Sequence, residues 1–395
     1  MKSEQQPSRI VCLSNVYDHQ YHELRGEEIS RCLSSPKRRD LFRCLELATG
    51  REVIVLSSPP KALNRRHGKR LPAVETHFST HRQFFCANWD APKLRIVISW
   101  FMYALHVLRH TQTGDIVLID NYELIYILAA YFTRIFRRVD FVLDYEDGKH
   151  LIDRSWSALL SRPAEWMGCR LVRAAILAHP SLGKRLPAGV PTVLVPGFIL
   201  KRGNATKTSG NGPINFLYSG SLDSTRGVDL LLETLPLLPL TGWHLHISGA
   251  GVLKTLVENV ARDEKWNSHV TFHGSLPGEA YADLIQRCHV GINCQRVSDP
   301  ISSVTFPSKI FSYLSAGLLV LSSHASGVPE ICGGACIYFD EETPVSLAEA
   351  MQRIVEDHGE LLRHKAGDLL ATKYGIDGTA QRLKKLLSTV VASGC

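Results

Sequence analysis

The chain has 395 residues, of which 45% are hydrophobic and 21% are charged, and its formal net charge is +7. This length and apolar content suffice for two α/β domains, each with its own core. No apolar run reaches the roughly 18–20 residues of a membrane-spanning helix, and residues 1–9 are polar, so we expect a cytoplasmic protein. The modest positive charge favours anionic ligands or a membrane surface, and no stretch has the pattern of a nucleic-acid-binding module.

Ten cysteines are scattered along the chain. None forms a Cys-x-x-Cys pair or a cysteine and histidine group at zinc spacing; the closest pairs are Cys288 with Cys294 and Cys332 with Cys336. We therefore expect reduced, buried cysteines and no metal site.

The first half opens with a strand, a helix and a second strand, at residues 10–14, 36–47 and 53–56. This order is typical of a Rossmann-like domain. Lys37, Arg38 and Arg39 begin the helix. We interpret them as a solvated helix start, with contact to an anionic acceptor as the alternative.

Two further segments bear on membrane contact. Residues 61–70 hold five Lys or Arg residues and His67, and we interpret them as a surface loop, with contact to anionic lipid headgroups as the alternative. Residues 96–108 carry large side chains at helical spacing, namely Trp100, Phe101, Tyr103, Leu105 and Leu108. We expect a buried amphipathic helix there rather than a helix on a membrane surface.

Two acidic clusters follow predicted strands. A strand at 115–119 leads into the polar residues 120–123, and a strand at 139–143 leads into residues 144–148, which include Glu146 and Asp147. Ligands of open α/β sheets bind beyond the carboxyl ends of the strands, so both clusters are candidate site segments. The second is the stronger candidate because core packing does not explain its acids; the alternative is that Asp144 or Asp147 caps the next helix.

The second half repeats the strand and helix pattern after a polar linker at residues 201–213. A strand at 214–218 is followed by a loop with Gly220, Ser221 and Arg226 and then by a helix at 228–235. A cation before a helix start suits phosphate binding, and an exposed surface arginine is the alternative. A second strand at 245–248 runs into Gly249 and Gly251.

The most informative stretch lies at residues 305–330. Ser308 opens a helix there, Gly317 ends it, and residues 318–321 form a buried strand. Ser308 and Lys309 therefore stand at a helix start that faces a strand end, where α/β folds bind phosphate groups. The alternative is an ordinary repeat unit of any doubly wound domain.

The run from Phe306 to Lys309 and on through Tyr313 to Gly317 resembles the donor-binding segment of glycosyltransferase family 4, within the glycosyl transferases group 1. The resemblance implies the α/β GT-B fold, in which two Rossmann-like domains face each other across a cleft. It implies an acceptor-side domain at residues 1–197 and a nucleotide-sugar-binding domain at 213–372. Residues 373–395 would form a C-terminal helix that packs back on the first domain.

The resemblance also assigns the site. The nucleotide-sugar-binding residues would be Gly220, Ser221, Arg226, Gly249, Gly251, Phe272, Ser308, Lys309 and Ser312. Glu146 and Asp147 would be the catalytic candidates, because the equivalent strand end of the family often lines the cleft. Ser312 and Val304 stand where the family has glutamates, and Arg226 stands where it has a lysine.

The implied activity is that of a hexosyltransferase-like enzyme of glycoconjugate or polysaccharide biosynthesis. It would transfer a sugar, with retention, from a UDP- or GDP-sugar to a glycan, lipid-linked or small-molecule acceptor. We expect no cofactor or metal, because the chain has no Asp-x-Asp signature and its cations can stabilise the leaving diphosphate. The alternatives are a degenerate binding or scaffolding subunit, a sugar-nucleotide epimerase, and a peripheral membrane transferase that contacts the inner face through the basic loop.

Overall fold

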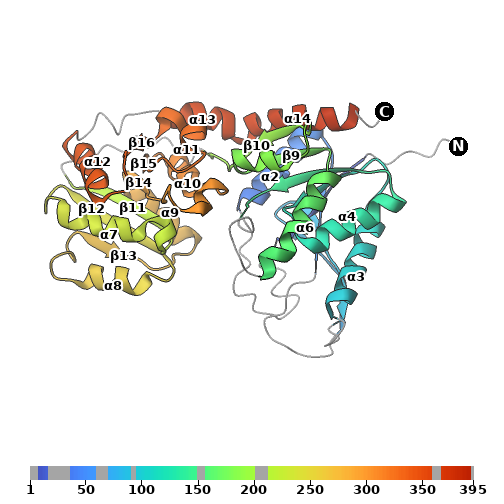
Figure 1. Ribbon diagram of the computed structural model, residues 1–395, viewed down its shortest axis with the longest axis horizontal. Helices are drawn as coiled ribbons and strands as arrows, with labels where there is room; N and C mark the ends of the chain where they lie inside the picture. Colours follow the sequence, from blue (N-terminus) through green and yellow to red (C-terminus); the bar gives the residue numbers. More distant parts are fainter. Residues whose placement is uncertain are drawn as a thin grey trace. The chain divides into compact units, whose positions relative to one another are not determined.

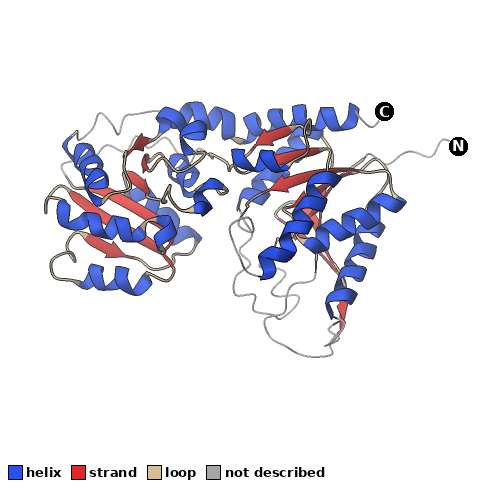
Figure 2. Ribbon diagram, viewed as in Figure 1, coloured by secondary structure: helices blue, strands red, loops and turns tan. Residues whose placement is uncertain are grey.

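The computed structural model describes residues 8–16, 36–58, 70–89, 95–148, 156–200, 212–357 and 366–392. Contacts divide the chain into two compact units. Unit 1 comprises Met1–Pro196 and Ile376–Cys395, and unit 2 comprises Gly197–Gly375. Each unit combines a mainly parallel sheet with packed helices, so the predicted α/β class is confirmed (Figure 2).

The main sheet of unit 1 has eight strands. They are β1 (Ile10–Leu13), β2 (Val53–Ser57), β4 (Val74–Phe78), β5 (His81–Phe85), β7 (Ile116–Asp120), β8 (Asp140–Tyr145), β9 (Ala174–Leu177) and β10 (Thr192–Leu194). Their order is β10-β9-β8-β7-β1-β2-β5-β4, and only β4 runs antiparallel to its neighbour (Figure 1). The central strands β1, β2 and β7 are buried throughout, as expected for parallel strands covered on both faces.

The helices of unit 1 form two groups. They are α2 (Pro36–Thr49), α3 (Arg95–His110), α4 (Leu124–Phe136), α6 (Trp156–Leu171), the 3-10 helix η1 (Pro180–Arg185) and α14 (Ile376–Ala392). Helix α4 contacts both α3 and α6, whereas α2 packs against α14. The short strands β3 (Arg70–Leu71) and β6 (Asn88–Trp89) form a separate antiparallel pair, and β6 contacts α3.

The C-terminal helix belongs to the core of unit 1. Leu383, Leu386 and Leu387 of α14 are buried, and α14 contacts α2, β9 and β10. The guanidinium of Arg382 donates a hydrogen bond to the carbonyl oxygen of Leu194 at 2.6 Å. The chain therefore closes unit 1 with residues that come after the whole of unit 2.

Unit 2 contains a six-stranded, fully parallel sheet. Its strands are β11 (Ile214–Ser221), β12 (Trp243–Ala250), β13 (Val270–Phe272), β14 (Val290–Asn293), β15 (Leu319–Ser322) and β16 (Ile337–Tyr338). The order is β13-β12-β11-β14-β15-β16. Successive strands extend the sheet in one direction from β11 to β13 and in the other from β14 to β16. The switch point lies between β11 and β14, which is where such sheets bind ligands.

Helices and 3-10 turns surround this second sheet. They are η2 (Ser224–Arg226), α7 (Val228–Thr234), η3 (Leu235–Leu237), α8 (Lys254–Arg262), α9 (Gly278–Arg287), η4 (Pro300–Ser303), α10 (Lys309–Ser315), α11 (Val328–Cys332), η5 (Gly333–Ala335), α12 (Pro344–Glu356) and α13 (Ala366–Tyr374). The core between sheet and helices includes Phe216, Trp243 and Met351.

Three sequence expectations differ from the structure. The predicted terminal helix is divided at Gly375, which lies between α13 and α14. A Cβ at this position would lie 2.4 Å from the carbonyl oxygen of Ala371, and glycine allows this close approach. The expectation that the helix at 96–108 is buried is wrong for its first half, because Ile96, Val97 and Phe101 are exposed. Lys37 and Arg38 are ion-paired and partly buried rather than solvated, and only Arg39 of the triplet is exposed.

Other expectations fall on residues that the structure leaves undescribed. Most of the basic loop at 61–70 and of the linker at 201–213 lies outside the described residues. The eight cysteines within the described part are all buried, and none of them forms a disulfide bond with another. Among the described helices, none has both the length and the apolar composition required to cross a membrane.

Truncation of Leu383 should destabilise unit 1. The side chain is fully buried in α14, so Leu383→Ala should lower the free energy of unfolding by about 2–5 kcal/mol through lost burial and a residual cavity. Chemical denaturation checks this, with the exposed neighbour Lys384→Ala as the control, expected within about 0.5 kcal/mol of the parent. An equally small effect of Leu383→Ala would contradict the placement of α14 in this core.

Candidate functional site

A pocket of about 460 Å³ opens at the carboxyl edge of the unit 2 sheet. It is rich in hydroxyl groups, contributed by Ser219, Ser221, Ser248, Ser275, Ser308, Ser312 and Tyr281. Lys309 is the one charged residue of its lining, and no carboxylate lines it. A lining of hydroxyl donors and one ammonium suits an anionic, phosphate-like group.

Lys309 occupies an unusual environment in this pocket. Its Nζ is buried and has no hydrogen-bond partner among the described residues, and it lies 3.7 Å from the ring centroid of Tyr218. The pKa of Lys309 is lowered from 10.5 to about 8, chiefly by burial and also by the nearby charge of Arg226, against the opposing effects of Cys294 and Asp223. A buried ammonium without a hydrogen-bonding partner is costly, so this pocket is suited to an anion that would satisfy it.

Two glycines keep the strand ends open beside this lysine. Gly220 and Gly249 are paired in register on β11 and β12, with φ values of +136° and +152°. A Cβ at Gly249 would lie 1.8 Å from the carbonyl oxygen of Gly220, and one at Gly220 would lie 3.6 Å from the Nζ of Lys309. Side chains here would therefore block the approach of a ligand to the lysine.

A network of hydroxyl groups forms the floor of the pocket. The backbone N–H of Ser219 donates to the Tyr313 hydroxyl at 2.9 Å, and the Ser219 hydroxyl lies 2.9 Å from that of Tyr281. Tyr313 fits because Gly291 has no side chain: a Cβ there would lie 2.2 Å from the tyrosine ring. Tyr218, Tyr281 and Tyr313 were not predicted as site residues, because only the tertiary fold brings them together.

The structure brings together six of the nine predicted donor-binding residues. Gly220, Ser221, Gly249, Ser308, Lys309 and Ser312 all line the pocket. Phe272 lies in β13 and packs partly against the core, whereas Gly251 lies under the carbonyl group of Leu222. These two positions have packing roles in the structure.

Arg226 lies near the pocket but outside its lining. Its guanidinium donates a hydrogen bond to the side-chain oxygen of Gln295, and its backbone N–H donates to Asp223 at 2.9 Å. It is partly buried, so it is not a freely exposed surface arginine. Its charge acts on Lys309 through space, as the lowered pKa of that lysine shows.

A second polar group gathers at the carboxyl edge of the unit 1 sheet. Lys37 Nζ donates to Glu146 at 2.9 Å, and an Arg38 guanidinium nitrogen donates to Asp120 at 2.5 Å. The Ser14 hydroxyl also donates to Asp120, at 2.6 Å. Helix α2 thus supplies the two cations, while β7 and the end of β8 supply the acids.

The carboxyl groups of Asp144 and Glu146 differ in ionisation. Burial, and then the charge of Glu146, raise the pKa of Asp144 well above its usual value. Burial also opposes ionisation of Glu146, but the attraction of Lys37 and Arg38 outweighs it and lowers the pKa of Glu146. The pKa values of the two neighbouring carboxyl groups are therefore shifted in opposite directions. Neighbouring carboxyl groups with separated pKa values are typical of sites that handle protons or hydroxyl groups.

Two details complete this group. The Tyr122 hydroxyl donates a hydrogen bond to Asp147 at 3.1 Å. Asp144 lies inside β8, so the alternative that it caps the next helix is wrong. The described residues contain no cluster of three or more His, Cys, Asp and Glu side chains placed to hold a metal ion.

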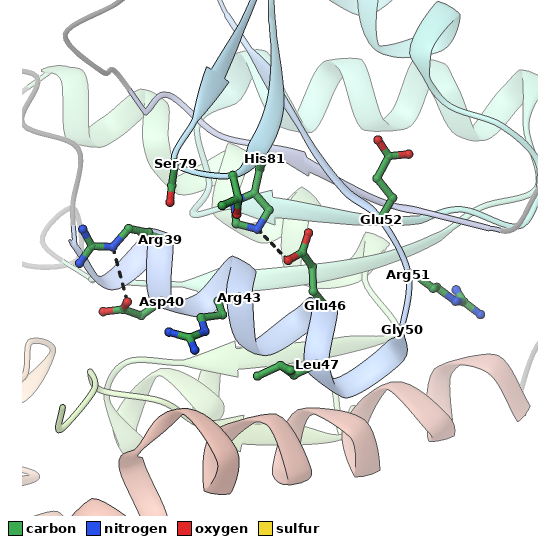
Figure 3. Close-up of a pocket in the computed structure, with 11 residues that line it drawn as sticks. Arg39, Asp40, Arg43, Glu46, Leu47, Gly50, Arg51, Glu52, Ser79 and His81 are labelled. Atoms are coloured by element: carbon green, nitrogen blue, oxygen red, sulfur yellow. Dashed lines mark ion pairs between the residues drawn. The ribbon is translucent and has the colours of Figure 1, made fainter. Parts of the chain in front are cut away.

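A larger pocket, of about 700 Å³, lies elsewhere in unit 1 (Figure 3). It is bounded by α2, the loop that follows α2, and the turn before β5, at the amino ends of the strands. Its charges are partly balanced internally, since Glu46 lies 3.3 Å from His81 and Arg39 lies 3.6 Å from Asp40. Because α/β sheets bind ligands at the carboxyl ends of their strands, the smaller unit 2 pocket is the better candidate.

Comparison with known proteins supports this choice. Residues 213–357 match the family described as "Glycosyl transferases group 1". That segment contains the whole unit 2 pocket. No curated protein matches the chain by sequence.

Several solved structures are similar to the chain along nearly its whole length. Sucrose-phosphate synthase from Thermosynechococcus elongatus has a TM-score of 0.67 and 14% identity, covering 98% of this chain and 100% of its own. HepE from Anabaena in complex with UDP has a TM-score of 0.67 and 14% identity, with coverages of 96% and 100%. The catalytic domain of starch synthase IV from Arabidopsis thaliana, bound to ADP and acarbose, has a TM-score of 0.66 and 10% identity, with coverages of 98% and 100%.

These matches define the fold class. The chain has the GT-B fold of glycosyltransferases, as the resemblance of its 306–317 segment implied. Its second unit carries the match to glycosyl transferases group 1.

The lowered pKa of Lys309 predicts a stability change with pH. Below about pH 8 the lysine is charged in both the folded and unfolded states, and its burial costs stability. Between about pH 8 and 10.5 the unfolded state binds more protons, so this cost declines as the pH rises. Lys309→Met should therefore raise the melting temperature of the ligand-free protein at pH 7, and the difference should shrink towards pH 10.5.

Thermal unfolding at several pH values measures this difference. Lys254→Met is a matched control, because Lys254 is 53% exposed on α8. The buried charge on Lys309 would be contradicted if Lys309→Met did not raise the melting temperature at pH 7, or if its stabilising effect grew with pH.

Proposed function

We propose that the chain is a glycosyltransferase that moves a sugar from a nucleoside-diphosphate sugar to an acceptor hydroxyl. The observation that carries this proposal is the ammonium of Lys309, which has no hydrogen-bond partner among the described residues and lies in a hydroxyl-lined pocket at the carboxyl edge of the unit 2 sheet. A diphosphate supplies the negative oxygens that this ammonium and the serine hydroxyls lack. The proposed donor site comprises Gly220, Ser221, Gly249, Ser308, Lys309 and Ser312, with Arg226 acting at longer range.

The chemistry of transfer explains why a cation is needed. When the bond between the sugar and the diphosphate breaks, negative charge builds up on the leaving oxygen atoms. A preorganised ammonium in a site of low polarity stabilises this charge better than water does, so no strong acid is needed. We propose that Lys309 has this role without a metal ion, with retention at the anomeric carbon as the family resemblance implies.

The related structures support a nucleoside diphosphate as the leaving group. HepE is described in complex with UDP and with UDP-glucose, and starch synthase IV in complex with ADP. Diphosphates of uridine, guanosine and adenosine are therefore the ligands to test first.

Unit 1 is proposed to bind the acceptor. Glu146 is ionised at neutral pH and partly exposed, so it can accept a hydrogen bond from an acceptor hydroxyl. Burial raises the pKa of the neighbouring carboxyl group of Asp144. Asp147 is proposed as a second contact, positioned by its hydrogen bond from Tyr122.

A binding subunit without turnover is the second candidate. Val304, which stands where the family has an acid, is 7% exposed, and Ser312 has no carboxylate to bind a ribose. Both substitutions favour loss of catalysis. They leave the ammonium of Lys309 in place, so both candidates predict diphosphate binding and differ only in turnover.

Donor binding can be tested by thermal shift with UDP, GDP and ADP. A diphosphate at about 100 times its dissociation constant should stabilise the protein by about 2.7 kcal/mol. Lys309→Met should abolish the shift, whereas Lys254→Met should retain it. No shift with any diphosphate would contradict the proposal.

Turnover separates the remaining candidates. Incubation of the binding nucleotide sugar with sugar acceptors should release nucleoside diphosphate, and Glu146→Gln should bind the donor but slow this release. Donor binding without release identifies the binding subunit, and formation of an epimerised free sugar without an acceptor identifies an epimerase.

A further inference from the structure

The surface of unit 1 has an unusual concentration of exposed apolar side chains on α3 and α4. Among the described residues of unit 1, most of the large apolar side chains that are exposed lie on these two helices. They are Ile96, Val97, Phe101, Ile135 and Phe136, with exposed fractions between 55% and 74%. We call these five residues, together with the exposed arginines described below, the α3–α4 surface.

Core packing does not account for these side chains. The inward sides of both helices are already occupied: Tyr103 and Val107 of α3, and Tyr126 and Ile127 of α4, are buried. The Tyr103 hydroxyl also donates to the carbonyl oxygen of Leu56 at 2.8 Å. The apolar side chains of the α3–α4 surface are therefore separate from those that form the core. Each large side chain left exposed loses roughly 1.5–3 kcal/mol of the free energy that burial would contribute.

The charges on this surface have one predominant sign. Arg109, Arg134, Arg137 and Arg138 are exposed; Arg134 and Arg137 directly flank Ile135 and Phe136, and Arg138 follows. Between residues 95 and 139 the acids are Asp115, Asp120 and Glu123, of which only Glu123 is exposed. Asp115 and Asp120 are buried and paired with Arg9 and Arg38.

The two helices lie together on the outside of unit 1. Helix α3 contacts α4 (Figure 1). The guanidinium of Arg137 donates to the carbonyl oxygen of Thr111 at 3.3 Å, which joins their carboxyl ends. Ile96 and Val97 begin α3, whereas Ile135 and Phe136 end α4. The exposed apolar residues therefore occur at both ends of the helix pair, as an extended surface rather than a groove.

We propose that the α3–α4 surface docks unit 1 on a bilayer that carries anionic phospholipids. Apolar side chains that alternate with arginines are the pattern of helices that lie in a membrane interface, where Ile and Phe enter the acyl boundary and arginines bind lipid phosphates. A second copy of the chain fits less well, because a two-fold contact would bring two arginine-bearing surfaces of like charge together. This inference does not depend on glycosyl transfer, and it uses none of the basic residues at 61–69.

Vesicle flotation of the full chain tests the proposal. The protein should bind vesicles of phosphatidylcholine mixed with phosphatidylglycerol and should remain free with phosphatidylcholine alone. The double variant Arg134→Glu and Arg138→Glu should lower the partition coefficient roughly 30-fold or more, from about 1 kcal/mol for each arginine removed. The double variant Phe101→Ser and Ile135→Ser should lower it roughly tenfold or more.

Matched controls lie on unit 2. Val252 is 86% exposed and Arg262 is exposed on α8, so Val252→Ser and Arg262→Glu change similar side chains away from the α3–α4 surface. Both should float as the parent does. All variants should keep a melting temperature close to that of the parent, which reports that both units remain folded.

Two results would overturn the proposal. One is the absence of binding to anionic vesicles. The other is sedimentation of the parent as a dimer that becomes monomeric in Phe101→Ser with Ile135→Ser, because the surface would then join two copies of the chain.

Discussion

The ammonium group of Lys309 is the feature on which the candidate donor site depends. It is buried without a hydrogen-bond partner among the described residues, and the energetic penalty appears as a pKa lowered to about 8. The rest of the site keeps this group in place and accessible. Helix α10 carries it, the Tyr218 ring lies 3.7 Å from it, and Gly220 and Gly249 leave the adjoining strand ends uncovered. An anion bound in the pocket would offset the free-energy cost of burying the Lys309 ammonium.

The cations at the candidate site of unit 1, unlike Lys309, are paired with carboxylates. Lys37 is paired with Glu146, and Arg38 with Asp120, so the cations of α2 are satisfied within the fold. The consequence lies in the acids: burial raises the pKa of Asp144, whereas the cations of α2 lower the pKa of its neighbour Glu146. A charged cation site in unit 2 and a paired acidic site in unit 1 are the two chemical functions that transfer from a diphosphate to a hydroxyl requires.

Much of this arrangement could be predicted from the sequence, because the signals are local. Buried parallel strands such as β7 and β14 are mainly apolar runs, and glycines and serines mark the ends of β11 and β12. Six of the residues predicted to bind the donor line one pocket, and their role in donor binding remains a proposal. The resemblance of one short segment then identified the fold.

What the sequence did not predict depends on contacts between distant residues. The pairing of Lys37 with Glu146 spans 109 positions, and Tyr281 meets Ser219 across 62. Arg226 was expected to reach the diphosphate, but its guanidinium is bonded to Gln295, which lies 69 positions away. The periodicity of 96–108 correctly indicated an apolar helix, yet it could not show that α4 covers only part of it.

The most direct test of the account is a crystal structure of the protein with a nucleoside diphosphate bound. The account predicts a phosphate oxygen about 2.7–2.9 Å from the Nζ of Lys309, with serine hydroxyls of the same pocket on the remaining oxygen atoms. A diphosphate bound elsewhere, with this ammonium still unpartnered, would contradict it.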